Sequence, residues 1–397
     1  MKRIELIDAL RGFALFLILI YHAYDGFGTG PGAGDGTFSS ARLDPAVTSF
    51  IYLLVINKAF AIFSIMFGFS FFIQMDRSSL KGENFSLIFA RRLLILFVIG
   101  YLHALIYRGD ILTKYAVTGF VLLLLSRLNS RMLAALAILL LIQVPQIWAI
   151  FQSTSLPADA VTAAGSMSMT GDNGPWPEIL AAYRSGSFAD VIRVNAWSAF
   201  SEVWRLNIQS GRILLIVAYF ILGLLLGRSR FFENIEANRK YIKYVLAGGA
   251  VLYGALRFIR SLTSASAGYS PYTRELIASL LNEYMDVSLA VMILAAFVMI
   301  YHNPMARKVM NLLVPYGRAG LTSYVAQGVI GVIVFYGFGL ALHRYSSPLF
   351  SVAAGFLILA VQLVFSHYWM KRYAYGPVEW AWRSLTYPGR KIPLKRQ

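Results

Sequence analysis

Two side chains suited to catalysis lie on the first hydrophobic segment of the chain, residues 6–24. Arg11 and His22 are eleven positions apart. At 100° per residue this spacing is three turns plus about 20°, so both side chains share one helix face, roughly 16 Å apart along the axis. Histidine is a general base near neutral pH, and arginine binds phosphate oxygens. A charge at membrane depth usually faces a protein interior or a water-filled cavity, so we interpret this face as one wall of a cavity.

Two carboxylates accompany this pair. Asp8 lies one turn before Arg11 on the same segment, and we predict that it contacts substrate. Asp25 follows His22 by three positions and is predicted to orient the imidazole. The alternative for Asp25 is a solvated position in the loop that follows.

A second polar group surrounds the turn between segments 86–107 and 111–126. His103, Arg108, Asp110 and Tyr115 are predicted to contribute substrate contacts or to support them. The alternatives are a histidine hydrogen-bonded between helices and an aspartate that only caps a helix N-terminus.

The segment 317–343 begins GRAGLTSYVAQ and places Arg318 and Tyr324 within an otherwise apolar helix. We predict that both contact substrate. Thr322 and Gln327 are typical of hydrogen bonds between membrane helices.

The composition requires a membrane to accommodate the elements that position these groups. The chain has 397 residues, of which 58% are hydrophobic and 14% charged, and several apolar runs reach bilayer-spanning length. Because there is no cysteine, disulfides, a thiolate nucleophile and cysteine metal sites are excluded. The sequence also has no Walker A motif, no dinucleotide fingerprint in a strand–helix context and no zinc-type histidine cluster.

The hydrophobic pattern predicts an all-α, polytopic membrane bundle of about ten transmembrane helices. The expected spans are 6–24, 49–75, 86–107, 111–126, 131–152, 211–227, 241–262, 280–301, 317–343 and 349–370. With the N-terminus in the cytoplasm, 23 of the 36 lysines and arginines fall on the cytoplasmic side, 12 on the other side and Arg11 within the first span. This bias obeys the positive-inside rule and places both termini in the cytoplasm.

We treat residues 1–397 as a single integral membrane domain with two peripheral parts. Residues 153–209 are predicted to form an extracytoplasmic loop with interfacial helices, which either cover the bundle or cap a substrate entrance. Residues 371–397 are predicted to form a cytoplasmic amphipathic tail, with Trp380 and Trp382 at headgroup depth.

Several stretches together carry a family resemblance: IDALRGFALFLILI, KAFAIFSIMFGFSFFIQMDR, RRLLILFVIGYLHALIYRGDILTKYAVTGF, GRAGLTSYVAQGVIGVIVFYGFGL and YGPVEWAWRSLTY. In order and extent they resemble the bacterial YeiB-like membrane proteins, long catalogued as a domain of unknown function. That family is grouped with the transmembrane acyltransferases, which include the lysosomal heparan glucosaminide acetyltransferase and the acyltransferase-three proteins.

The acyltransferase-three proteins share an arginine, ten residues and a histidine in their first helix, and Arg11 and His22 reproduce that spacing. Many YeiB-like proteins carry asparagine at the second position, so this chain departs from them toward the acyltransferases. The departure favours an enzyme here and leaves open whether the whole family shares an activity.

The resemblance implies transfer of an acyl group from a cytoplasmic acyl-CoA, with acetyl-CoA as the expected co-substrate and no metal. His22 would be the base, Arg11 would hold the donor, and a small molecule or glycan would be the acceptor. The alternative is a transporter or channel for a small polar or anionic solute through a cavity lined by Arg11, His22 and Asp110. A non-catalytic scaffold is a third hypothesis. The expected partners are the lipid bilayer and a second copy of the chain in a homodimer, with no nucleic acid, and the expected location is the bacterial cytoplasmic membrane.

Overall fold

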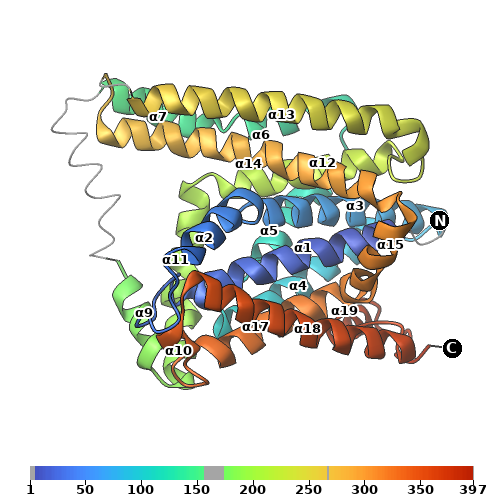
Figure 1. Cartoon of the computed structure of the whole chain (residues 1–397). Coiled ribbons are helices and arrows are strands. Elements are labelled where there is room, and N and C mark those ends of the chain that lie inside the picture. Colours follow the sequence, from blue (N-terminus) through green and yellow to red (C-terminus); the bar gives the residue numbers. More distant parts are fainter. Residues whose placement is uncertain (1–4, 156–173, 266–267, 397) are drawn as a thin grey trace.

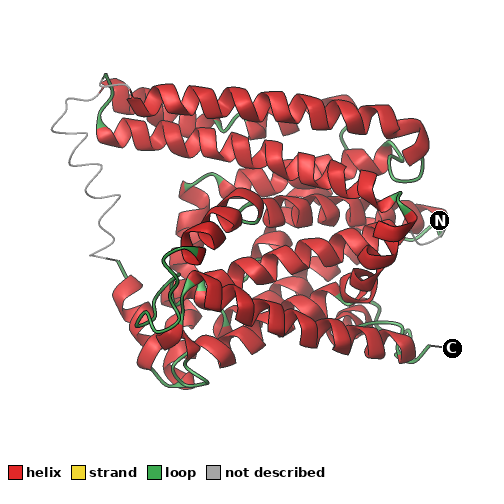
Figure 2. Ribbon diagram, viewed as in Figure 1, coloured by secondary structure: helices red, strands yellow, loops and turns green. Residues whose placement is uncertain are grey.

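A computed structural model describes residues 5–155, 174–265 and 268–396, which are mostly helical (Figure 2). Within these residues the only β feature is an isolated bridge between Tyr373 and Lys395. The predicted all-α class is therefore confirmed for this part of the chain. The basic residues Lys2 and Arg3, and residues 156–173 of the predicted loop, lie outside the described residues.

The described helices occur in the following order along the chain. Up to Ser155 they are α1 (Glu5–Tyr24), η1 (Gly26–Gly28), α2 (Leu43–Leu54), α3 (Lys58–Leu80), α4 (Phe85–Ile106), α5 (Leu112–Leu125), α6 (Ser130–Leu141) and α7 (Val144–Ser155). The rest are α9 (Trp176–Ser185), α10 (Phe188–Val194), η3 (Asn195–Ala199), α11 (Phe200–Gln209), α12 (Arg212–Arg228), α13 (Ile235–Ala265), α14 (Pro271–Tyr301), α15 (Pro304–Met310), η4 (Asn311–Leu313), α16 (Val314–Arg318), α17 (Gly320–Phe335), η5 (Leu342–Tyr345), α18 (Pro348–Arg372) and α19 (Pro377–Thr386).

By length and composition this is a multi-pass membrane protein. Among the described residues, seven helices are long and apolar enough to cross a membrane, or up to nine if two bent helix pairs each count as one span. The ten predicted segments all fall on helices, but three of them form no straight span. Helix α5 has only 14 residues, α12 follows α11 across a bend of 70°, and α17 follows the α15–α16 segment across a bend of 82°.

The predicted span 317–343 is too long at its C-terminal end. Helix α17 ends at Phe335 because Tyr336 adopts an extended conformation. The Gly337 amide then donates to the Tyr183 carbonyl at 2.9 Å. Only glycine fits at position 337, because a Cβ would collide with the backbone of α9. The apolar run continues past this point, so hydropathy alone does not locate the helix end.

Helix α1 lies at the centre of the bundle and packs against α3, α16 and α18 (Figure 1). Most of its side chains are buried, including the charged Asp8. Helices α3 and α12 form another close pair, because Gly68 and Gly223 bring the two backbones together and a Cβ at either glycine would strike the other helix. These contacts fix the frame that holds Arg11 and His22.

Two peripheral parts flank this frame. The predicted loop 153–209 carries α9, α10, η3 and α11, and Ser187 begins α10 with a capping box to Asp190. The long helices α13 and α14 form an antiparallel hairpin along one side of the bundle, at the top of Figure 1. Helix α1 begins and α18 ends at the same end of the bundle (Figure 1).

Candidate functional site

Three adjoining cavities follow α1 from the end of the bundle at which it begins. The first, which we call the basic cavity, has a volume of about 520 Å³. The second, the apolar neck, has about 230 Å³ and shares several wall residues with the basic cavity, among them Arg11 and Arg318. The third, the polar chamber, has about 240 Å³ and shares Phe63, Tyr115 and Tyr324 with the neck.

The basic cavity is lined by six cationic side chains: Arg11, Arg77, Lys81, Arg92, Arg318 and Arg383. Arg11 is fixed by two neighbours, since its guanidinium donates to Asp8 at 3.1 Å and to the Ser70 hydroxyl at 2.6 Å. Asp8 is buried on the first turn of α1 and also lines this cavity. The excess of cations over carboxylates makes the cavity suited to an anionic ligand.

The tail helix α19 forms part of the wall of the basic cavity. The Arg92 guanidinium lies 3.9 Å from the centre of the Trp382 ring, and the Trp382 indole N–H donates to the Arg92 carbonyl at 2.8 Å. Glu379 accepts hydrogen bonds from the backbone amides of Leu321 and Thr322, so it caps the first turn of α17. The Trp382 ring therefore packs against Arg92 of α4 and lines the basic cavity, and its position at headgroup depth stays a prediction.

The polar chamber contains the other half of the predicted pair. His22 is buried on α1, and its Nδ1 is hydrogen-bonded to the Tyr107 hydroxyl at 2.6 Å. Asp25 lies in the same chamber but faces Arg108, whose Nη2 is 3.9 Å from the Asp25 carboxylate. The side chain that orients His22 is thus Tyr107, whereas Asp25 holds a cation. Burial raises the pKa of Asp25 to about 6, and the Arg108 charge opposes that rise.

Arg108 connects the chamber to the segment of helices α9–α11, which we call the cap. Its guanidinium donates to the Gly28 carbonyl at 3.1 Å and lies 4.8 Å from the centre of the Trp176 ring on α9. Helix α11 contributes Val203 and Asn207 to the chamber wall. The cap therefore takes part in enclosing the chamber, and whether it covers a substrate entrance stays a prediction.

The second predicted polar group is built around Asp110 at the start of α5. One carboxylate oxygen is 3.0 Å from the His103 Nδ1, and the other accepts the Thr113 amide at 2.9 Å. The Lys114 ammonium donates to the Asp110 carbonyl at 2.5 Å and lines the chamber. Asp110 is thus a helix cap and also a chamber residue, and His103 lies behind it, packed against Gly328.

The remaining predicted residues lie where the cavities meet. Tyr324 accepts the Ile111 amide at 3.0 Å and donates to the Gly109 carbonyl at 3.2 Å, so it fixes the turn beside the chamber. Tyr115 is hydrogen-bonded to the Ser64 hydroxyl at 2.6 Å between the neck and the chamber. Arg318 lines both the basic cavity and the neck. Apart from His103, every predicted site residue lines at least one cavity.

Sequence reasoning missed several residues that complete these walls. Tyr107 is next to Arg108 in the sequence, but its role is to bind His22, which lies on a helix 85 positions earlier in the chain. Arg92 was counted only as a cytoplasmic charge, and Glu379 only as part of the tail. The single acidic residue of the basic, aromatic tail, Glu379, was the available signal for an inward-facing contact.

Comparisons with known proteins agree with the resemblance at the level of a family. Residues 226–389 match the family described as "Protein of unknown function (DUF418)". The uncharacterised protein YxaH of Bacillus subtilis (strain 168) is 28% identical over 419 residues, which cover 97% of this chain and 94% of that protein. An uncharacterised 39.9 kDa protein in the amylase 3′ region of Bacillus acidopullulyticus is 26% identical over 404 residues, or 99% of this chain and 96% of that protein.

A shorter match links the chain to the uncharacterised protein YeiB of Escherichia coli (strain K12), which is 36% identical over 70 residues, or 18% of each chain. These matches fit a YeiB-like family of proteins of unknown function. No solved structure matches the chain significantly.

Proposed function

We propose that this protein is a membrane-embedded acyltransferase of the transmembrane acyltransferase superfamily, which moves an acyl group from a cytoplasmic acyl-CoA to an acceptor at or across the membrane. The observation that carries the proposal is the series of cavities along α1, in which Arg11 lines the basic end and His22 the polar end. Acetyl-CoA is the donor that we would test first.

The basic cavity suits the nucleotide end of CoA, which carries a phosphate and a pyrophosphate. Its six cationic side chains supply charge-assisted hydrogen bonds to such groups. Arg11 is held in place by Asp8 and Ser70, so little side-chain entropy is lost when it binds an anion.

The neck suits the pantetheine arm and the acyl group. It is lined mainly by apolar residues such as Met66, Phe67 and Leu96, and it begins beside Arg11. The helix rise between Arg11 and His22 is roughly 16 Å. An extended arm that follows this face would therefore bring the thioester to the chamber.

In the chamber, direct transfer requires one base and one group that stabilises negative charge. His22 takes the proton of the acceptor hydroxyl while the acceptor oxygen forms a bond to the thioester carbonyl carbon. The cationic Lys114 and Arg108 line the same chamber and would stabilise the oxyanion of the tetrahedral intermediate. The C–S bond then breaks, and the CoA thiolate leaves and receives the proton from His22. Tyr107 holds the imidazole in position throughout.

The same proposal includes the topology. We place both termini in the cytoplasm of a bacterium, with the chain in the cytoplasmic membrane and the short α5 as a tenth membrane segment within the bundle. This orientation is supported by the excess of lysine and arginine at the end where α1 begins. It puts the basic cavity on the side that holds acyl-CoA.

The test uses membrane vesicles with radiolabelled acetyl-CoA and compares the wild type with His22→Ala and His367→Ala. His367 is an exposed histidine on α18 and serves as the matched control. Loss of a general base lowers transfer by about a hundredfold or more, so His22→Ala should lose label transfer while His367→Ala retains it. Acetyl-CoA should still raise the thermal stability of His22→Ala but not of Arg11→Gln. Full transfer by His22→Ala would remove this residue from the mechanism.

The alternative, transport of a small anionic or polar solute, is favoured by the same observation, because a transported solute also needs a series of adjoining polar cavities within the bundle. The two functions differ in what happens to the thioester. Solute accumulation in proteoliposomes without any release of CoA from acetyl-CoA would select transport over acyl transfer.

A further inference from the structure

A cavity of about 570 Å³ lies between α12 and the hairpin of α13 and α14. Within the described residues it shares no lining residue with the three cavities along α1. Eleven of its fourteen lining residues are apolar, among them Leu222, Phe231, Ile242 and Leu294. The proposed function gives this cavity no role.

The walls of this cavity select an apolar occupant. A buried water needs two to four polar partners, which aliphatic walls do not offer. An empty void of this size forfeits dispersion contacts along its whole lining. In a membrane the abundant apolar molecule is the lipid acyl chain, and about 570 Å³ lies within the range of sites that bind small molecules.

One end of the cavity is polar. Arg228 ends α12, and Ser229 and Ser130 lie beside it in the lining. The Arg228 guanidinium donates to the Ser126 carbonyl at 2.6 Å and to the Leu128 carbonyl at 2.8 Å, which fixes it at the C-terminal end of α5. No ion pair joins Arg228 to a carboxylate in the part of the chain that the structure describes, so its charge is available to an anion.

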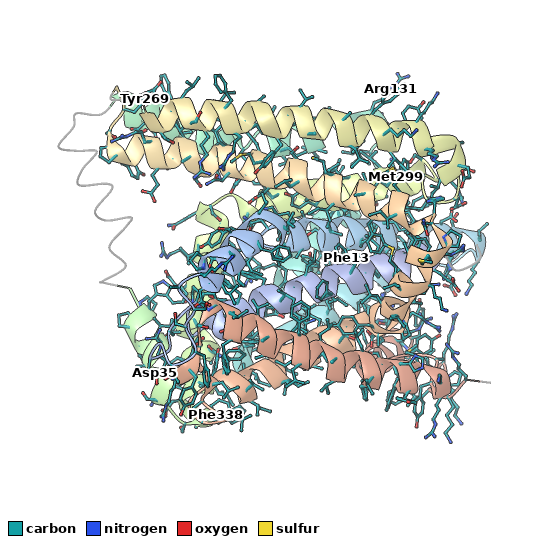
Figure 3. All side chains as sticks on the ribbon, in the orientation of Figure 1. Phe13, Asp35, Arg131, Tyr269, Met299 and Phe338 are labelled. Carbon is teal, nitrogen blue, oxygen red and sulfur yellow. The ribbon has the colours of Figure 1, made fainter. Side chains whose placement is uncertain are left out.

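Further cations surround this end. Arg131 begins α6, and Arg239, Lys240 and Lys243 occupy the first turns of α13, all with exposed side chains. Figure 3 shows Arg131 toward the end of the bundle at which the chain begins, together with Met299, and Tyr269 toward the other end. The nearby Glu233 is paired with Arg230. The charge at the mouth of the cavity is therefore strongly positive.

We propose that this cavity is a binding site for an anionic diacyl phospholipid of the cytoplasmic leaflet. The headgroup phosphate would lie at Arg228 and the basic first turns of α13, and the upper part of the acyl chains would fill the apolar cavity. Leu222 and Arg228 are six positions apart on α12, so at the helical rise per residue the apolar part of the cavity extends about 9 Å into the bilayer from the charged end. The bound lipid would join the α13–α14 hairpin to α12.

The experiment compares lipids that share the same acyl chains. Purified, delipidated protein in detergent receives phosphatidylglycerol or phosphatidylcholine, and both the thermal unfolding temperature and the lipid retained in native mass spectrometry are measured. We expect phosphatidylglycerol alone to be retained and to raise the unfolding temperature. Removing Arg239, Lys240 and Lys243 with glutamine should weaken binding by about fivefold for each charge.

Two variants separate the cavity from the surface charge. Ala295→Phe fills the apolar part without changing any charge, because Ala295 is a buried lining residue on α14. It should abolish retention of phosphatidylglycerol in protein that stays folded. Arg260→Gln, which removes a cation from the far end of α13, is the control and should retain the lipid. Equal retention of the two lipids by the wild type, or unchanged retention of phosphatidylglycerol by Ala295→Phe, would refute the proposal. If Ala295→Phe does not fold, Ala295→Leu is tested in its place with the same criteria.

Discussion

Glu379 offers a test of how the tail helix is attached. Its side chain is half-buried, and its Oε1 accepts the backbone amides of Leu321 at 2.5 Å and of Thr322 at 3.1 Å. These two amides belong to the first turn of α17, where no intrahelical acceptor exists. The Thr322 hydroxyl is hydrogen-bonded to the other carboxyl oxygen at 2.5 Å. One side chain from α19 thus satisfies three polar groups of α17.

Replacing Glu379 with alanine leaves two buried amides without an acceptor. Each such loss costs about 1–3 kcal/mol, so we expect the free energy of unfolding to fall by about 2–6 kcal/mol. Glutamine keeps a carbonyl acceptor for both amides and an N–H donor for the Thr322 hydroxyl. At acidic pH, where the Glu379 carboxyl is protonated, Glu379→Gln should therefore differ from wild type by less than about 1 kcal/mol.

The pH dependence of stability shows whether the charge of Glu379 stabilises or destabilises the folded protein. Burial raises the pKa of Glu379 in the folded protein above its ordinary value of 4.5. The folded state therefore favours the protonated form, and the stabilisation from Glu379 is complete below its unfolded pKa and is lost as pH rises through its folded pKa. Wild-type stability should fall below that of Glu379→Gln across this interval, and the two should coincide at the acidic end.

The assay is thermal unfolding in detergent, followed by tryptophan fluorescence, since Trp382 lies on the same helix as Glu379. Proteolysis after Arg383 would report release of α19 independently. The reasoning fails if Glu379→Gln is as unstable as Glu379→Ala, or if the difference between wild type and Glu379→Gln grows as pH falls.

Two further predictions concern buried contacts near the chamber. Gly328→Ala should reduce the acyl transfer rate and the unfolding temperature, because the new Cβ would collide with the His103 Nε2 and move the ring away from Asp110. Gly328→Ser should reduce both quantities at least as much, because serine carries the same Cβ. Lys58→Met should destabilise the fold by about 3–5 kcal/mol because it leaves the Asp286 carboxylate without its ion-pair partner. The double variant Lys58→Met with Asp286→Leu should recover most of that loss in denaturant or thermal unfolding, and a double variant less stable than the single one would contradict this reading of the pair.

The sequence predicted best what depends on local periodicity. The spacing of Arg11 and His22 placed both side chains on one helix face, and both line cavities along α1. Apolar runs likewise located helices at all ten predicted segments. Helix periodicity is a property of residues that are close in sequence, so it can be predicted without knowing how distant segments pack.

What the sequence could not supply is the partner of each polar side chain. Asp25 was the nearest carboxylate to His22 in sequence, yet Tyr107 on a distant segment makes the hydrogen bond. The overlong span 317–343 has the same origin, because its end depends on the Gly337 amide meeting the Tyr183 carbonyl. Each of these contacts joins segments whose relative position is set by the packing of the whole bundle.

The tail helix shows why this distinction matters for function. Its aromatic and basic pattern is that of a helix at the membrane surface. In the structure, Trp382 also covers the Arg92 guanidinium, and Glu379 caps the first turn of α17. Both residues line the basic cavity and the neck. Because α17 begins two residues after Arg318, Glu379 binds the backbone next to the residue that lines both cavities.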